Sequence, residues 1–147
     1  MTTPHQLVNP AQLARPAGYT HAVVSSAGRM VHVAGQIGAD ANGRVAATDL
    51  AAQLDVALGN LVVALDAAGA APEHVVAMQL FTTVMDEYRS NLRKIGRVYR
   101  RHLGRHFPAM ALVGVTELVE PAAKVEVMAT AVIVDESPAR PASGSGH

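Results

Sequence analysis

The stretch Lys124–Val134, KVEVMATAVIV, decides the fold class because it is apolar on both faces of one strand. Side chains alternate between the two faces of a strand. One face carries Val125, Val127, Ala129, Ala131 and Ile133, and the other carries Met128, Thr130, Val132 and Val134. Such a strand is typical of a sheet that is covered on both sides. The elements that cover it must therefore come from the preceding part of the chain.

Two helices are predicted before this strand. The first has a leucine stripe at helical spacing, formed by Leu50, Leu54, Leu58, Leu61 and Leu65. We expect Thr48 to cap its start and Gly69 to end it. We expect Asp86 to cap the start of the second helix and Gly104 to end it. Its apolar stripe is Tyr88, Leu92, Ile95, Tyr99 and Leu103.

Short apolar runs predict the remaining strands, at 21–25, 30–36, 75–83 and 109–115. We expect 21–25 to pair with 30–34 across a turn. The order is then ββαβαββ, which predicts an α/β (α+β) domain with one mixed sheet and both helices on one face. Nothing else in the chain covers the other face, so the sequence predicts self-association through it.

Length and composition fit one small domain. The chain has 147 residues, half of them hydrophobic, with 12 basic and 12 acidic side chains and no cysteine. Balanced charge gives no overall attraction to nucleic acid or membranes, and the lack of cysteine excludes disulfides and thiolate chemistry. The start is polar and unlike a signal peptide, so we expect a cytoplasmic protein. We expect an N-terminal segment at 1–14, the domain at 15–134 and a disordered tail at 135–147.

Several short motifs follow one another in an order and spacing that resemble the Rid family, also known as YjgF or L-PSP endoribonuclease-like proteins. They are PAGYTHAV at 16–23, VAGQI at 33–37, the helix 53–69 ending in AAG, the strand region 75–88, FPA at 107–109 and KVEVMATA at 124–131. The resemblance implies a chorismate-mutase-like subunit. It also implies a homotrimer with a central barrel and clefts between subunits, which agrees with the uncovered sheet face.

The resemblance also implies a chemistry. The best-known subgroup hydrolyses enamines and imines such as 2-aminoacrylate, using an arginine directly after Phe-Pro-Ala and a glutamate late in the final strand. Here Met110 stands at the arginine position, Leu112 at the polar position two residues later, and Met128 at the glutamate position. Methionine neither binds a carboxylate nor transfers a proton. We therefore do not expect the usual deaminase route.

Three polar residues are candidate catalytic groups. Tyr19 matches a tyrosine at the edge of the family's pocket, although it could equally pack at an interface. His21 could act as a general acid or base near neutral pH, or could bond within the sheet. Glu126 is the acid inside the final strand. It would be a candidate general base if buried, or an ordinary surface partner of a cation if exposed.

Further residues are candidate ligand contacts. Gly35 and Gln36 follow an early strand, near the cleft of the relatives, and Thr82 ends a later strand. Their alternative roles are a turn glycine, its polar neighbour and an ordinary strand threonine. Met110, Leu112 and Met128 would make the same cleft apolar.

Two other patterns suggest nucleic acid or metal, and both are better explained by ordinary structure. Seven cations lie between Arg89 and Arg105. Because no aromatic side chains alternate with them, we interpret them as a solvated helix face and not as an RNA site. His102 and His106 have a spacing that can bind metal on a helix, but Gly104 between them ends the helix. We therefore expect no metal and no cofactor.

The sequence is compatible with two classes of function. The first is a Rid-like enzyme that acts on a small imine, enamine or related metabolite in the cleft between subunits. The second is a non-catalytic trimer that binds a small apolar ligand or a protein partner. Methionine and leucine at the three substituted positions favour the second class. The enzymatic activity of the best-known family members favours the first.

Overall fold

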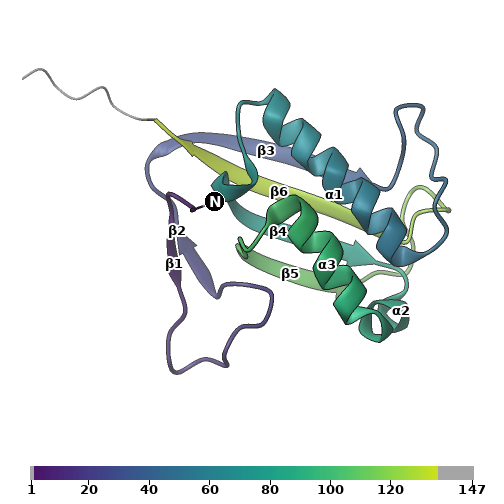
Figure 1. Ribbon diagram of the computed structural model, residues 1–147, viewed down its shortest axis with the longest axis horizontal. Helices are drawn as coiled ribbons and strands as arrows, with labels where there is room; N and C mark the ends of the chain where they lie inside the picture. Colours follow the sequence, from purple (N-terminus) through teal and green to yellow (C-terminus); the bar gives the residue numbers. More distant parts are fainter. Residues whose placement is uncertain (1, 136–147) are drawn as a thin grey trace, which may run out of the picture.

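The computed structural model describes residues 2–135, which form a four-stranded mixed sheet with helices on one face (Figure 1). The strands lie in the order β3 (Gly28–Ile37), β6 (Val125–Val134), β4 (Val75–Thr82) and β5 (Ala109–Gly114). β6 is antiparallel to both of its neighbours, whereas β5 is parallel to β4. The predicted mixed α+β fold is confirmed.

The two long helices, α1 (Leu50–Ala67) and α3 (Leu92–Leu103), pack side by side on the same face of the sheet (Figure 1). The predicted leucine stripe of α1 is almost completely buried in the core. By length and composition alone α1 could cross a membrane, but its apolar stripe packs on the sheet as the core helix of the domain. Gly69, with a φ of +82°, follows its C-terminus as predicted.

Two details of the helices differ from the prediction. The N-cap of α1 is Asp49 and not Thr48, because the Asp49 carboxylate accepts a hydrogen bond from the Ala52 N–H at 2.8 Å. The second predicted helix is two helices, α2 (Met85–Ser90) and α3, and Asp86 is inside α2 and not its cap. The chain leaves helical geometry at Asn91, where φ is −128° and ψ is 28°. The apolar spacing continues across this break, so periodicity alone does not reveal it.

The N-terminal region forms a separate ribbon of two strands, β1 (Gln6–Val8) and β2 (Ala22–Val24). The expected pairing of 21–25 with 30–34 is therefore wrong. The imidazole of His5 accepts a hydrogen bond from the Ser26 N–H and donates one to the Val132 carbonyl. These bonds connect the start of β1 to the segment after β2. β2 therefore pairs with β1, and not with β3 as predicted.

A short 3-10 helix, η1 (Pro72–His74), leads into β4. The predicted tail 135–147 lies outside the described residues apart from Asp135, which forms an ion pair with Arg29 on β3. β1 lies within the segment 1–14 that the sequence leaves outside the domain.

The face of the sheet opposite the helices remains largely open. Val127, Ala129 and Ala131 of β6 point toward the helices and are buried. On the other face, the exposed apolar side chains are Met30 at 60%, Val113 at 43% and Met128 at 39%. Both helices therefore lie on one side, as predicted, and apolar side chains of the other side face solvent in the single chain.

Candidate functional site

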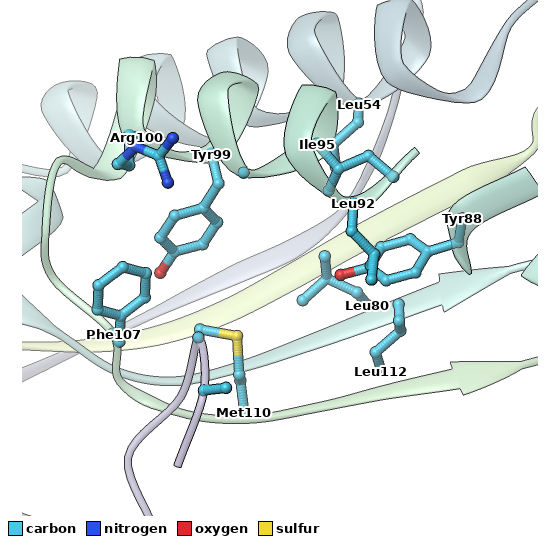
Figure 2. A pocket seen from close by; sticks show the side chains of 13 residues that line it. Leu54, Leu80, Tyr88, Leu92, Ile95, Tyr99, Arg100, Phe107, Met110 and Leu112 are labelled. Atoms are coloured by element: carbon cyan, nitrogen blue, oxygen red, sulfur yellow. The ribbon is translucent and has the colours of Figure 1, made fainter. Parts of the chain in front are cut away.

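A cavity of about 310 Å³ lies between α3 and the β5 side of the sheet (Figure 2). Leu80, Met110 and Leu112 form its floor on β4 and β5. The α3 side chains Leu92, Ile95 and Tyr99 contribute the opposite wall. Ala17 and Gly18, from the loop between β1 and β2, form a further part of the lining. The cavity is thus built where the N-terminal loop, α3 and the sheet edge meet.

Two tyrosines line the cavity but differ in what their hydroxyls do. The Tyr99 hydroxyl donates a hydrogen bond to the His106 carbonyl at 2.7 Å, and its ring stacks on Phe107. The Tyr88 hydroxyl points into the cavity, and it has no hydrogen-bond partner among residues 2–135 (Figure 2). Burial raises the pKa of both phenols, so each stays protonated at neutral pH.

Glu87 fixes the short helix that carries Tyr88. Its carboxylate accepts hydrogen bonds from the Leu50 N–H at 2.8 Å and from the Lys124 ammonium at 2.9 Å. The Leu50 N–H, followed by Lys124, holds the pKa of Glu87 below its usual range. Glu87 therefore anchors α2 to the start of α1 and to Lys124, which directly precedes β6, and this holds the Tyr88 ring at the cavity.

Of the predicted site residues, Met110 and Leu112 line this cavity. Tyr19 follows Gly18, but its ring packs edge-on against His21 with centroids 5.1 Å apart. The His21 ring bonds the Ala14 carbonyl at 2.7 Å. Tyr19 and His21 therefore brace the loop behind the cavity wall, and their predicted catalytic roles are not tested by this placement.

Thr82 and Gln36 lie outside the cavity and make local hydrogen bonds. The Thr82 hydroxyl is fully buried and donates to the Lys124 carbonyl at 2.8 Å. The Gln36 amide donates to the Ala34 carbonyl at 3.1 Å. Both side chains thus stabilise strand ends, and their roles as ligand contacts stay predictions.

Glu126 and Gly35 meet on the open face of the sheet. The pairing of β3 with β6 shifts register between Val33 and Gln36, which marks a bulge beside Gly35. The Glu126 carboxylate lies against the Gly35 backbone, in space that any side chain at residue 35 would fill. Met128 is exposed on this same face. Within one chain, Glu126 and Met128 are therefore separated by the sheet from Met110 and Leu112.

The histidines considered as metal ligands have other partners. The His102 ring bonds the Asp55 carboxylate at 2.6 Å, and the His106 ring bonds the Val75 carbonyl at 2.7 Å. Over residues 2–135 no group of three or more histidine, aspartate or glutamate side chains is placed to hold a metal ion.

Sequence reasoning missed Tyr88 and Arg100 as cavity residues. The sequence pattern places Tyr88 in an apolar helix stripe and Arg100 in the solvated cation cluster. One signal in the sequence does point to Arg100. Gly96 lies one helical turn before it, which leaves room for a long side chain to fold back over the helix.

Comparison with known proteins places the chain in a family. The model of the endoribonuclease L-PSP family matches residues 10–133. Protein DfrA of Myxococcus xanthus is 34% identical over 115 residues, which cover 78% of this chain and 84% of DfrA.

Solved structures agree with this match. The Rid family protein YyfB from Yersinia pestis has a TM-score of 0.78 and 32% identity, over 88% of this chain and 98% of YyfB. Rv2704 from Mycobacterium tuberculosis, of the YjgF/YER057c/UK114 family, has a TM-score of 0.59 and 34% identity, over 79% and 87% of the two chains. With sequence and fold matching over most of its length, the chain belongs to the L-PSP endoribonuclease family, also called the YjgF or Rid family.

Proposed function

We propose that the chain is a small-molecule-binding member of this family and that the cavity below α3 binds a small, largely apolar molecule. The observation that carries the proposal is the chemistry of the wall. Met110 and Leu112 form the floor with other apolar side chains, and the polar side-chain groups at the cavity belong to Tyr88, Tyr99 and Arg100. Tyr99 has already donated its hydrogen bond, so few polar contacts are left for a ligand.

Binding fits this wall better than acid–base catalysis does. Among residues 2–135, no carboxylate and no imidazole lines the cavity. Both phenols have raised pKa values, so neither exchanges a proton readily at neutral pH. A volume of about 310 Å³ falls at the small end of ordinary ligand pockets, which cover roughly 300–1,000 Å³. A compact apolar molecule would be stabilised there by burial of its surface.

The test uses phenylacetamide, a compact neutral molecule, and isothermal titration of the full chain. Met110→Gln places an amide on the cavity floor at similar volume. We expect it to weaken binding by about tenfold, because the buried amide lacks a partner. Met128→Gln is the matched control on the opposite face and should leave the affinity unchanged. Loss of binding in the Met128 variant alone, or no binding by the wild type, would refute the proposal.

We also propose that the chain forms the homotrimer with a central barrel that the family resemblance implies. The supporting observation is the apolar surface of the open sheet face, where Met30, Val113 and Met128 are exposed. Monomeric proteins seldom leave such a sheet surface in water. Clefts between subunits would then border this face.

Hydrolysis of an imine or enamine in such a cleft is the second candidate function. It is favoured by the Glu126 carboxylate, which lies against Gly35 on the open face, where a neighbouring subunit would enclose it. An enclosed carboxylate could accept a proton from an attacking water molecule. This places the candidate base away from the cavity below α3, so the two functions concern different sites.

The second candidate is tested by generating 2-aminoacrylate, or imines of neutral and branched amino acids, in situ and following ammonia and keto acid. We expect Glu126→Gln to abolish any catalysed release of ammonia and keto acid. A lower rate of release in Tyr19→Phe or His21→Ala would show that the loop between β1 and β2 takes part. A wild-type rate equal to the rate in buffer would remove this candidate for those substrates.

A further inference from the structure

We propose that the solvent side of the helical layer is a docking site for an acidic amphipathic helix of another protein. The site, called the outer groove, is formed by Ala52, Val56 and Val63 of α1 and by Lys94 and Arg97 of α3. It goes beyond the function proposed for the cavity below α3. Among residues 2–135, no residue that lines the hollow between α1 and α3 also lines that cavity.

The apolar half of the outer groove is a stripe on the solvent side of α1. Ala52, Val56, Gly59 and Val63 recur at helical spacing, on the side of α1 opposite its buried leucines. Val56 is 40% exposed and Val63 is 69% exposed. The outward side of a surface helix is ordinarily charged or polar, whereas the sequence of α1 contains no lysine or arginine. A helix that is apolar on both sides is suited to a second covering element.

The basic half of the outer groove borders a hollow between the two helices. This hollow, of about 330 Å³, has the buried side chains of Ala51 and Val98 at its base and Lys94 and Arg97 in its wall. A second hollow of about 400 Å³ continues along α3 toward α2 and shares both cations. Since α1 and α3 lie side by side on the sheet (Figure 1), the recess follows the helices and has the shape that receives another helix.

The cations of the outer groove have no acidic partner. Among residues 2–135, neither Lys94 nor Arg97 forms an ion pair, and the neighbouring Arg93 forms none either. The one carboxylate in the hollow belongs to Asp55, which already pairs with Arg101 at 2.6 Å. Lys94 and Arg97 are one turn apart on α3, so acidic side chains one turn apart on a partner helix have matching spacing. Charge complementarity therefore favours an acidic partner.

Other occupants match only part of this surface. A second copy of the chain in a two-fold contact would place Lys94 and Arg97 against the same residues of its mate. RNA would satisfy the cations, but bases stack on aromatic side chains, and the side chains that define the outer groove are aliphatic or cationic. A helix with leucines on one face and glutamates along its flank uses both halves of the outer groove.

The experiment titrates a fluorescent peptide with the full chain at low salt and follows the anisotropy. The peptide has about 18 residues, enough to span the stripe at about 1.5 Å per residue, with leucines on one face and glutamates along one flank. One control peptide has lysines in place of the glutamates, and another has the original residues in scrambled order. We expect the acidic amphipathic peptide to bind at least about tenfold more tightly than either control.

Variants of the chain test each half of the outer groove. Arg97→Glu should weaken binding of the acidic peptide by at least about tenfold, because it replaces an attraction by a repulsion. Val56→Asn and Val63→Asn should each weaken it by about threefold or more through lost apolar contact. The matched controls are Arg105→Glu, an exposed cation that lines neither hollow, and Val119→Asn, an exposed valine in the loop before β6. Both controls should leave the affinity unchanged.

Four outcomes would overturn the proposal. Equal binding of the scrambled or lysine peptide would show that the outer groove does not select an acidic amphipathic helix. Equal losses in Arg105→Glu and Arg97→Glu would assign the attraction to the general charge of the surface. Unchanged affinity in both valine variants would remove the apolar stripe from the site. Tighter binding of a uridine oligonucleotide, or of vesicles of phosphatidylcholine and phosphatidylserine, would assign the surface to nucleic acid or to membranes.

Discussion

Asp55 on α1 has two hydrogen-bond partners on α3. Its carboxylate bonds the His102 ring at 2.6 Å and the Arg101 guanidinium at 2.6 Å. The bond to His102, more than the contact with Arg101, lowers the pKa of Asp55 from its ordinary value of 3.8. A carboxyl whose pKa is lowered by folding stabilises the protein above its unfolded pKa, and this contribution is lost as pH falls through the folded value.

We therefore expect Asp55→Asn to lower the free energy of unfolding by about 1 kcal/mol at neutral pH, a typical net value for a partly exposed charged hydrogen bond. Urea denaturation at a series of pH values measures it. The difference from wild type should shrink as pH falls below 3.8. Asp86→Asn is the control, since Asp86 is fully exposed beside Arg89 and should change little. Equal losses in both variants would contradict the prediction.

At the level of single residues, part of the site follows from the sequence. The motif Phe-Pro-Ala leads directly to Met110 and Leu112, and both line the cavity. Tyr88 and Arg100 do not follow, because a tyrosine in an apolar stripe and an arginine among other cations have ordinary explanations. Only the packing of α2 and α3 on the sheet reveals that these two side chains reach one cavity.

Among the elements, α1 could be predicted almost completely and β1 not at all. Five leucines in phase over several turns leave little alternative to a helix buried on one side. β1 has three residues and is held by pairing with β2 and by the bonds of His5, none of which leaves a periodic pattern. The helix break at Asn91 was hidden for a related reason, because the apolar spacing is in phase on both sides of it.

Gly59 inside α1 and Gly69 just after its C-terminus should respond in opposite directions to the same substitution. Gly59 is inside the helix, and an added Cβ would be 3.5 Å from His102 Cε1, which is ordinary contact. Gly59→Ala should stabilise the protein by about 1 kcal/mol through helix propensity. Gly69 has a φ of +82°, so Gly69→Ala should destabilise it by about 1 kcal/mol. Chemical denaturation measures both, and changes of the same sign would contradict this account.

For the whole molecule, the order of the predicted strands and helices correctly indicates that both helices cover one face of the sheet. The two-sided apolar pattern of β6 then indicates that the other face is apolar as well. The bulge beside Gly35 and the placement of Met110 and Met128 on opposite faces do not follow from it. Those features depend on the register between strands, which distant pairing determines.

The open face provides a test of assembly. We expect sedimentation equilibrium to give three times the 15.3 kDa mass of one chain. Val113→Lys would place a charge on the open face and should dissociate the assembly. Val63→Lys is the control, because Val63 is a 69% exposed valine on α1, away from that face. A wild-type sample that sediments as single chains, or dissociation by both variants, would refute the trimer.

The close approach of Glu126 to Gly35 also constrains how this sequence can change during evolution. Any side chain at residue 35 would occupy the space of the Glu126 carboxylate. Homologues with a larger residue at 35 should therefore carry a shorter one at 126. A survey of related genomes can check this covariation, and frequent pairing of a bulky residue at 35 with glutamate at 126 would show that the bulge adapts more readily than this packing implies.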